Sequence, residues 1–491
     1  MSVKRAAAFR GGTSPLMQVA RAPVVALMLA KHAPVFVILC APPAIWAVAE
    51  GQAILALALA IPATFAALVF LAVARRPLPD DLRGVEAIVT IALVFGMSAV
   101  FVTPAFMALG MPVVDALFEA VSGATTTGLS VAFNPDAWPF AGHFLRAWVQ
   151  WCGGLVMATA VLAMLLPSGL PARKLGQAGI DQGDRIASTR KQARQLLTAY
   201  AALTGIMTLA TMATIPDWRE ALAVTLSAVS TAGFAPRSDS LASYAPLAQG
   251  MVMLSCVLGA VSLLSFVLLS QGKWRQAWRL GSLRRVGLTV ILFVAALIAF
   301  LVAAGERDAG AIYSSALNLI SGLTTAGFST GPISDLGPVL LLIVVAMVLG
   351  GDVGSTAGGL KLARVAVIVG AILHAGQRLR LPRNAVAPLR QNGEPVAPET
   401  LVSILGLLGI YLGALMLLWL HILAHGHDAL GALFEATSTL STVGLSTGIT
   451  GPSMSVDLKL SMTFAMWLGR VEFFAVLLLL APRTWRGTTG G

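Results

Sequence analysis

Four short stretches of the sequence, each with one central glycine, decide how we interpret the fold. They are Thr125-Thr126-Thr127-Gly128-Leu129, Ser230-Thr231-Ala232-Gly233-Phe234, Thr324-Thr325-Ala326-Gly327-Phe328 and Ser441-Thr442-Val443-Gly444-Leu445. Successive glycines are 105, 94 and 117 residues apart, and each stretch lies between two apolar runs. This spacing indicates a fourfold internal repeat within one chain.

The chemistry of these stretches suits a cation filter. In a Thr-X-Gly sequence the backbone carbonyls can point inward, and glycine tolerates the φ values that such a strand requires. Four strands around one axis would form rings of carbonyl oxygens that replace the hydration shell of a potassium ion. The residues expected to line this filter are Thr126, Thr127, Gly128, Thr231, Ala232, Gly233, Thr325, Ala326, Gly327, Thr442, Val443 and Gly444.

The composition is that of a polytopic membrane protein. The 491 residues are 57% hydrophobic and 11% charged, whereas about 25% of the residues of a soluble chain are charged. The net charge of +11 does not indicate nucleic-acid binding, because the basic residues fall in short loops between apolar spans. Cys40, Cys152 and Cys256 lie in apolar runs, so we expect buried free thiols rather than disulfides or a metal site.

Ten apolar segments are long enough to be membrane helices, which need about 20 residues. They cover residues 23–48, 52–74, 84–110, 143–166, 194–215, 245–270, 286–304, 337–349 continuing through 360–373, 401–424 and 458–481. The first resembles a signal peptide, but it is longer than the roughly 7–15 residues of a signal core, so we expect a retained helix. Four shorter segments precede the glycines, at residues 113–126, 218–231, 311–325 and 428–442.

These segments predict an all-α polytopic membrane protein. We interpret each short segment as a re-entrant half-helix that leads into an extended filter strand, surrounded by protein or water at membrane depth. The repeat unit is then helix, half-helix, filter strand, helix, four times in a pseudo-fourfold arrangement around one pore, after a two-helix preamble. The expected divisions are residues 1–80 for the N-terminal segment and preamble, and 81–172, 173–282, 283–390 and 391–491 for the four pore repeats.

Lysine and arginine gather in one set of loops. They are Arg75, Arg76, Arg173, Lys174, Arg185, Arg190, Lys191, Lys273, Arg275, Arg279, Arg284, Arg285, Arg378, Arg380, Arg383 and Arg390. The positive-inside rule then places both termini in the cytoplasm and the filter toward the outside.

Two further groups of polar residues have competing interpretations. Glu119 and Glu435 lie nine residues before the first and fourth filter glycines, and we favour hydrogen bonding to neighbouring pore segments over attraction of cations. His421, His425 and His427 invite a metal site, because histidines four residues apart share a helix face. Only Asp428 stands nearby as a further ligand, so we favour a polar helix end at the membrane interface.

The second helix of the third repeat is interrupted by Leu349-Gly350-Gly351-Asp352-Val353-Gly354-Ser355-Thr356-Ala357-Gly358-Gly359-Leu360-Lys361. Its five glycines weaken a helix by about 1 kcal/mol each relative to alanine. A glycine-interrupted span indicates a mobile, cavity-lining element, and a kink for close helix packing is the alternative. The residues expected to form a gate are Gly350, Gly351, Asp352, Gly354, Ser355, Thr356, Gly358, Gly359 and Lys361, together with Arg470.

Arg470 lies inside the last apolar run, where a charge is costly unless it faces water or a partner. Glu472 is two residues away and does not share its helix face. We therefore expect Arg470 to face the pore below the filter, and we hypothesise that Asp352 pairs with it in one position of the gate.

Together these residues resemble the Trk/Ktr/HKT superfamily of potassium transporters, most closely its TrkH branch. The matching segments are Phe118-Glu119-Ala120 through Thr127-Gly128, Gln150-Trp151-Cys152-Gly153-Gly154, the loop from Gly350 to Lys361, and Leu468-Gly469-Arg470-Val471-Glu472. The fourth filter stretch looks closer to the Ktr branch.

The resemblance implies potassium uptake across the bacterial inner membrane through one pore per chain, with residues 350–359 as an intramembrane gate and Arg470 as an electrostatic barrier. It also implies a homodimer in the lipid bilayer and a cytoplasmic ring of TrkA-like nucleotide-binding regulatory subunits. Potassium would be the transported ion, with no organic cofactor in this chain.

Two other classes of function compete with a pore. An ion-coupled secondary transporter (a symporter) also uses discontinuous helices, but its repeats are commonly inverted, whereas these four run in the same direction. A membrane-embedded enzyme would need a polar catalytic cluster, and the sequence shows no clustered Asp, His and Lys set at membrane depth. We therefore expect a transporter and not an enzyme.

Overall fold

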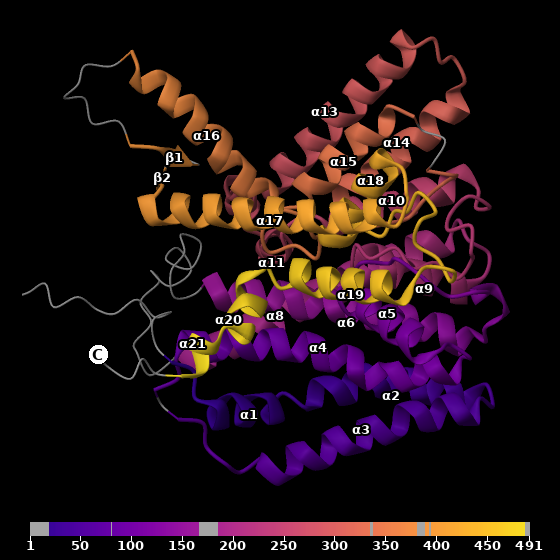
Figure 1. The fold of residues 1–491 in the computed structure, drawn as a ribbon, viewed down its shortest axis with the longest axis vertical. Coiled ribbons are helices and arrows are strands. Elements are labelled where there is room, and N and C mark those ends of the chain that lie inside the picture. Colours follow the sequence, from indigo (N-terminus) through magenta and orange to yellow (C-terminus); the bar gives the residue numbers. More distant parts are fainter. Residues whose placement is uncertain are drawn as a thin grey trace, which may run out of the picture.

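The structure, a computed structural model, describes residues 19–79, 81–165, 185–333, 337–380, 388–391 and 394–486. Figure 1 shows that helices make up almost all of the fold. The elements in chain order are α1 (Ala22–Lys31), α2 (Pro34–Ala49), α3 (Ala53–Val73), α4 (Gly84–Ala108), α5 (Val113–Ala124), η2 (Pro135–Ala137), α6 (Phe140–Leu165), α8 (Arg185–Met212), α9 (Trp218–Val229), α10 (Pro246–Gly259), α11 (Leu263–Ser270), α12 (Trp274–Leu280), α13 (Ser282–Ala303), α14 (Ala309–Thr324), α15 (Val339–Leu349), α16 (Leu362–Arg378), β1 (Arg390–Gln391), β2 (Glu394–Pro395), α17 (Pro398–Ala424), α18 (Ala429–Leu440), α19 (Val456–Arg470), α20 (Phe474–Leu480) and α21 (Pro482–Trp485).

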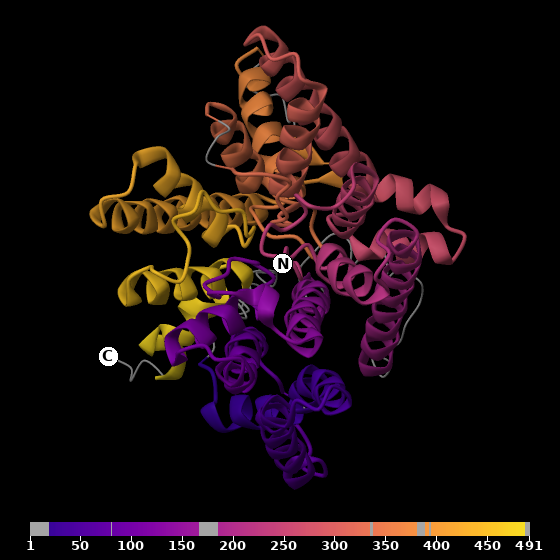
Figure 2. The same ribbon diagram turned by 90° about the vertical axis from the view of Figure 1, so that its right-hand side faces the viewer.

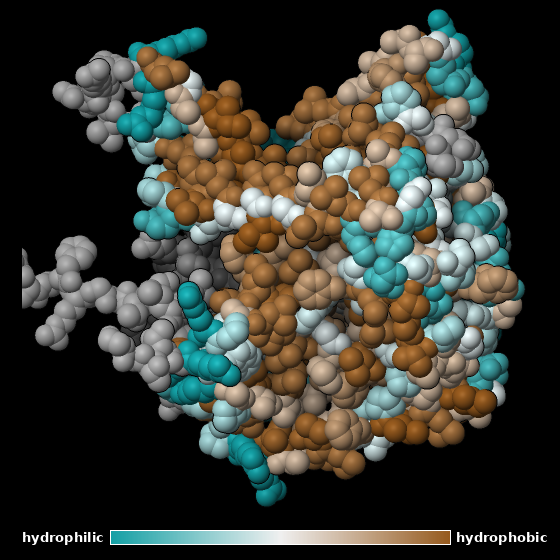
Figure 3. Space-filling view, in the orientation of Figure 1, coloured by the Kyte–Doolittle hydropathy of each residue, from teal (hydrophilic) through white to brown (hydrophobic). Residues whose placement is uncertain are grey.

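Long apolar helices form the main body of the described structure. Within the described residues, six candidate spans, with α1 and α2 counted as one, are long and apolar enough to cross a membrane, and two bent helix pairs bring the number to eight. Figure 3 shows an apolar band across the middle of the molecule, with hydrophilic residues gathered at the left and right edges of the view. This distribution is that of a protein embedded in a bilayer, because the hydrocarbon core accepts helices whose backbone groups are satisfied internally.

The four predicted half-helices are confirmed as α5, α9, α14 and α18, within two residues of the expected bounds. Three of them begin with an aspartate whose carboxylate accepts hydrogen bonds from backbone N–H groups of the first turn, namely Asp217, Asp308 and Asp428. Such N-caps satisfy donors that a helix start leaves free. Each half-helix runs directly into its glycine stretch.

The repeats pack in a closed circle. The second helix of each repeat lies against the half-helix of the next, so that α6 contacts α9, α10 contacts α14, α15 contacts α18, and α19 contacts α5. Figure 2 shows the purple, magenta, red-orange and yellow segments in sequence order around a common centre, with the indigo helices outside them. At the closing contact, Lys459 Nζ of α19 lies 2.7 Å from Asp115 Oδ1 of α5, and both side chains are largely buried.

Three predicted single helices are broken instead. The expected span 23–48 consists of α1 and α2, which meet just before Pro34, where a proline disturbs the regular backbone. The span 245–270 consists of α10 and α11, bent by 90°, and 458–481 consists of α19 and α20, bent by 115°. The second helix is thus interrupted in repeats two, three and four, whereas the sequence predicted a break in the third alone.

Two residues of left-handed backbone produce the bend between α19 and α20. Glu472 has φ +58° and Phe473 has φ +61°, a region that side chains other than glycine seldom occupy. At the bend between α10 and α11, the N–H of Leu263 donates to Gly354 O at 2.9 Å. The second interruption is therefore held by the loop that interrupts the third repeat.

The free, buried thiols expected of Cys40, Cys152 and Cys256 are confirmed.

Candidate functional site

The four glycine stretches, residues 125–129, 230–234, 324–328 and 441–445, have the same backbone conformation. The threonine two residues before each glycine has a φ between +51° and +55°, and the glycines have φ between +76° and +101°. The residue between them donates its N–H to the carbonyl of a serine five residues earlier at 2.8–3.0 Å in all four stretches. Local geometry therefore repeats four times although the sequences differ.

The four stretches form a closed ring. A Cβ atom built on each glycine would overlap the carbonyl oxygen of a neighbouring stretch, and the partners follow the order of the repeats. Gly128 meets Ala232, Gly233 meets Ala326, Gly327 meets Val443, and Gly444 returns to Thr127. Glycine is therefore required here for close approach as well as for its positive φ.

Helix α6 braces the ring through Gln150. The Nε2 of this buried side chain donates to Ala232 O at 2.7 Å, and its Oε1 accepts from the N–H of Phe234 at 3.2 Å. Ala232 was expected to offer its carbonyl to an ion, and in this conformation that oxygen already accepts the amide of Gln150. In the fourth stretch the hydroxyls of Tyr411 and Ser441 lie 2.7 Å apart.

The polar residues nine positions before three of the glycines form hydrogen bonds with the backbone that follows each glycine stretch. Each accepts from an N–H twelve residues later: Glu119 from Val131 at 3.2 Å, Asn318 from Thr330 at 2.9 Å, and Glu435 from Thr447 at 2.8 Å. Glu119 also pairs with the buried Arg146 of α6 at 2.9 Å. The expectation that Glu119 and Glu435 bind neighbouring segments is confirmed.

The glycine-rich loop, residues 350–361, packs against the start of the glycine stretches. The N–H of Gly358 donates to Thr325 Oγ1 at 2.7 Å, and the N–H of Gly359 donates to Ser441 O at 3.1 Å. Thr356 Oγ1 donates to Val229 O at 3.0 Å. The loop therefore contacts repeats two, three and four at the ends of their half-helices.

One buried cation, Lys361, lies in this loop, and another, Arg470, lies beside it. Arg470, with 2% of its surface exposed, donates from Nη1 to Thr356 O at 2.8 Å. Its Nη2 lies 3.5 Å from Gly153 O. Lys361 is also 2% exposed and donates to Ala357 O. Within the described ranges, no carboxylate oxygen lies within 4.0 Å of either cation, so their charges are not offset by an ion pair.

The carboxylates of this region bind other arginines. In this conformation Asp352 pairs with Arg285 at the start of α13, at 2.6 Å, and this ion pair holds the loop to α13. The hypothesised pair with Arg470 in another position of the gate stays a prediction. Glu472 pairs with Arg364 of α16 at 2.6 Å. The expectation that Glu472 does not pair locally with Arg470 agrees with this geometry.

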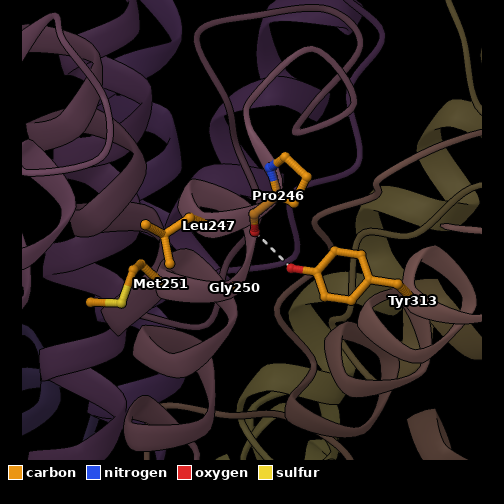
Figure 4. A pocket seen from close by; sticks show the side chains of 5 residues that line it. All are labelled: Pro246, Leu247, Gly250, Met251 and Tyr313. Atoms are coloured by element: carbon orange, nitrogen blue, oxygen red, sulfur yellow. Dashed lines mark hydrogen bonds between the residues drawn. The ribbon is translucent and has the colours of Figure 1, made fainter. Parts of the chain in front are cut away.

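A cavity of about 330 Å³ lies apart from the ring (Figure 4). It is lined by Pro246, Leu247, Gly250, Met251 and Tyr313, from α10 and α14. Tyr313 Oη donates to Pro246 O at 2.7 Å. The lining is almost entirely apolar and includes no residue of the glycine stretches or the loop, so we assign this cavity no part in ion binding.

The family follows from a comparison with known proteins. The family model TrkH, described as a cation transport protein, matches residues 101–302 and 288–486. The chain belongs to the TrkH family. It is 29% identical over 400 residues to the Trk system potassium uptake protein TrkH of Escherichia coli, which covers 77% of this chain and 80% of that relative. An uncharacterized cation transporter of Methanocaldococcus jannaschii is 28% identical over 375 residues, 75% of this chain and 76% of the relative.

The TrkH fold is also shared with a solved structure. The crystal structure of the potassium transporter TrkH from Vibrio parahaemolyticus aligns with a TM-score of 0.81 at 22% sequence identity, over 96% of this chain and 99% of that one. The resemblance to the TrkH branch is thus confirmed, and the chain is a multi-pass membrane protein of a transporter family rather than an enzyme.

Three residues that contact the site, Arg146, Gln150 and Arg285, were not among the predicted site residues. Arg146 and Gln150 lie inside the predicted span 143–166. A polar or charged side chain within a span was itself a signal that it has a partner at membrane depth. Arg285 carried no such signal, because it lies among other basic residues at the end of a loop.

Proposed function

We propose that this TrkH family member carries potassium ions through the ring of glycine stretches. The observation that supports this most directly is the closed circle in which each glycine lies against a carbonyl of another repeat. The ring stands at the C-terminal ends of four half-helices, where partial negative charge favours a cation. Potassium as the ion is supported by relatives named potassium uptake proteins.

Within this proposal, the residues of the glycine stretches replace water around the ion. Thr126 to Gly128, Thr231 to Gly233, Thr325 to Gly327 and Thr442 to Gly444 would contribute backbone oxygens. Carbonyl rings of this kind repay the cost of dehydration.

The basic loops support an inner-membrane location with both termini in the cytoplasm. Of these residues, Arg173, Lys174 and Arg383 lie outside the described residues, as do the side chains of Arg185 and Arg190.

We also propose the division into a preamble and four pore repeats, with boundaries after residues 80, 172, 282 and 390. A homodimer and a TrkA-like regulatory ring on the basic face rest on the resemblance.

The test of this function is rubidium uptake into vesicles that contain the purified protein. With an outward potassium gradient and no proton or sodium gradient, we expect rubidium to enter until the gradient is spent, and external potassium to compete with it. Sodium should enter more slowly. A flux that requires an imposed proton or sodium gradient would favour the symporter instead, and the absence of any flux would contradict the pore.

We further propose that the glycine-rich loop gates this pathway. The loop contacts Val229 of repeat two, Thr325 of repeat three and Ser441 of repeat four. Arg470, also of repeat four, donates to it as well. A hydrogen bond contributes about 1 kcal/mol net. A binding event worth a few kcal/mol can therefore displace a loop that is held by several such bonds.

Gly358→Ala is expected to weaken the closed position of this loop. The added Cβ would overlap Ser441 O and approach Thr442 Oγ1, so the loop must move away from the fourth stretch. We expect the unstimulated rubidium leak into vesicles to rise by about tenfold, which corresponds to about 1.4 kcal/mol. Gly376→Ala in α16 is the matched control, because its Cβ would meet nothing within 4 Å. Equal leak rates in the two variants would rule out the gate at this position.

A further inference from the structure

Three metal-ligand side chains from two distant segments meet in the fourth repeat. His421 and His425 lie at the C-terminal end of α17, and Asp457 lies in the first turn of α19. One ligand atom from each falls within 4.8 Å of the other two. From this geometry we propose that His421, His425 and Asp457 bind one divalent transition-metal ion of the zinc class.

The separations suit such an ion. Bonds of about 2.0–2.1 Å in a tetrahedral arrangement place ligand atoms about 3.3 Å apart. Asp457 Oδ2 lies 2.8 Å from His425 Nε2 and 3.7 Å from His421 Nε2, which brackets that value. The two imidazole rings are nearly perpendicular, with centroids 4.9 Å apart. The ligand atoms of His421 and His425 lie within 4.8 Å of each other, so side-chain movement would be needed to bring all three atoms to one ion.

A backbone hydrogen bond fixes which nitrogen of His425 faces the aspartate. His425 Nδ1 lies 2.9 Å from His421 O. A carbonyl oxygen only accepts, so Nδ1 carries the proton. In a neutral imidazole, Nε2 then presents a lone pair, and it does so 2.8 Å from a carboxylate oxygen. Two acceptors then face each other, and either a second proton on Nε2 or a metal ion coordinated by both atoms satisfies them.

The hydrogen bond from His425 Nδ1 to His421 O is of the kind that orients histidine ligands in metal sites. A histidine ligand commonly donates its other N–H to a backbone carbonyl, which orients the ring and raises its basicity. Spacing of four residues on one helix places both rings on the same face, as in metal-binding helices. His425 therefore has the orientation of a ligand before any ion arrives.

The surroundings leave the site accessible and its carboxylate available. The side chains of His421, His425 and Asp457 are 37%, 26% and 59% exposed, so water can occupy a fourth position. Lys459, two residues after Asp457, binds Asp115 instead. Asp428, the ligand considered from the sequence, caps α18 by accepting from Gly431 N at 2.7 Å. Among the basic side chains of the described residues, only the two histidines lie within 4.0 Å of the Asp457 carboxylate.

An ion here would join the end of α17 to the beginning of α19. These segments flank α18 and the fourth glycine stretch in the chain, so the ion would restrain repeat four on the side where its half-helix begins. The inference concerns metal binding and does not depend on which ion crosses the ring.

The test uses the full-length protein, purified without a polyhistidine tag and titrated with Co²⁺ in detergent. We expect one Co²⁺ per chain with visible d–d absorption, displaced by an equal amount of Zn²⁺. His425→Gln and Asp457→Asn should each weaken binding by at least about tenfold. His427→Gln is the matched control, because this histidine is nearby but outside the cluster, and it should bind as the unaltered chain does.

Three results would overturn the site. The first is a titration with no saturable signal, which would mean that the position holds a proton only. The second is binding that survives both ligand variants, and the third is binding that His427→Gln also abolishes. Tm measurements without metal confirm that each variant is folded, and rubidium uptake measured in parallel separates this proposal from the proposed transport.

Discussion

Replacing Gly128 by serine is expected to lower potassium flux by about tenfold or more and to raise sodium permeation relative to potassium. Gly128 has φ +89°, and its added Cβ would overlap the carbonyl oxygen of Ala232 in the second stretch. Holding a side chain in a left-handed conformation costs about 1–3 kcal/mol, and each 1.4 kcal/mol corresponds to about a factor of ten. The carbonyl ring must deform, so its fit to potassium is lost first.

The measurement compares rubidium and sodium uptake in the same vesicle preparation. Gly205→Ser in α8 serves as the control, because a Cβ at that position would meet nothing within 4 Å. It should leave both fluxes unchanged. If Gly128→Ser keeps the rubidium-to-sodium ratio of the unaltered protein, the assignment of the glycine stretches as the filter is wrong.

Arg470→Gln is expected to increase potassium flux while leaving selectivity intact. The guanidinium is buried without an offsetting carboxylate in the described ranges, so under the proposed function it would repel an ion leaving the ring. At about 6 Å and an effective dielectric near 20, that repulsion is on the order of 3 kcal/mol. Removing it would raise the rate by up to about a hundredfold.

Arg470 also holds the loop through Thr356 O, and Arg470→Lys separates the two roles. Lysine keeps the positive charge but loses the planar fork that reaches two carbonyls. If the charge limits conduction, the lysine variant conducts slowly and the glutamine variant conducts fast. If the hydrogen bonds to the loop matter instead, both variants gain flux alike. Unchanged flux in both would remove Arg470 from the pathway.

Local sequence patterns predicted the half-helices, their glycine stretches and the break in the third repeat, because each depends on residues that are close together in the chain. The half-helices and their glycines follow from apolar length and from the need for positive φ, and they repeat with the same register in all four repeats. The break in the third repeat was visible because five glycines oppose a helix there.

The interruptions in repeats two and four depend on contacts between distant residues. Residues 259–262 hold one glycine, and the helix after them begins with a hydrogen bond from Leu263 to Gly354. The partner of Asp352 is Arg285, 67 residues away, and that of Glu119 is Arg146 in another helix. No local pattern selects these partners, because each depends on which helices the circle brings together.

The contact that closes the circle of repeats limits the order in which the repeats can assemble during synthesis. Helix α19 packs against α5, and Lys459 reaches Asp115 across 344 residues of chain. During synthesis the first three repeats can insert and associate as they leave the ribosome, since domains fold in order of emergence. The first half-helix packs against α4 and α6 as well, but it lacks its contact with α19 until the last repeat is translated. A nascent chain stopped before α19 therefore already contains the fourth half-helix and its glycine stretch, but it lacks the helix that closes the circle against α5.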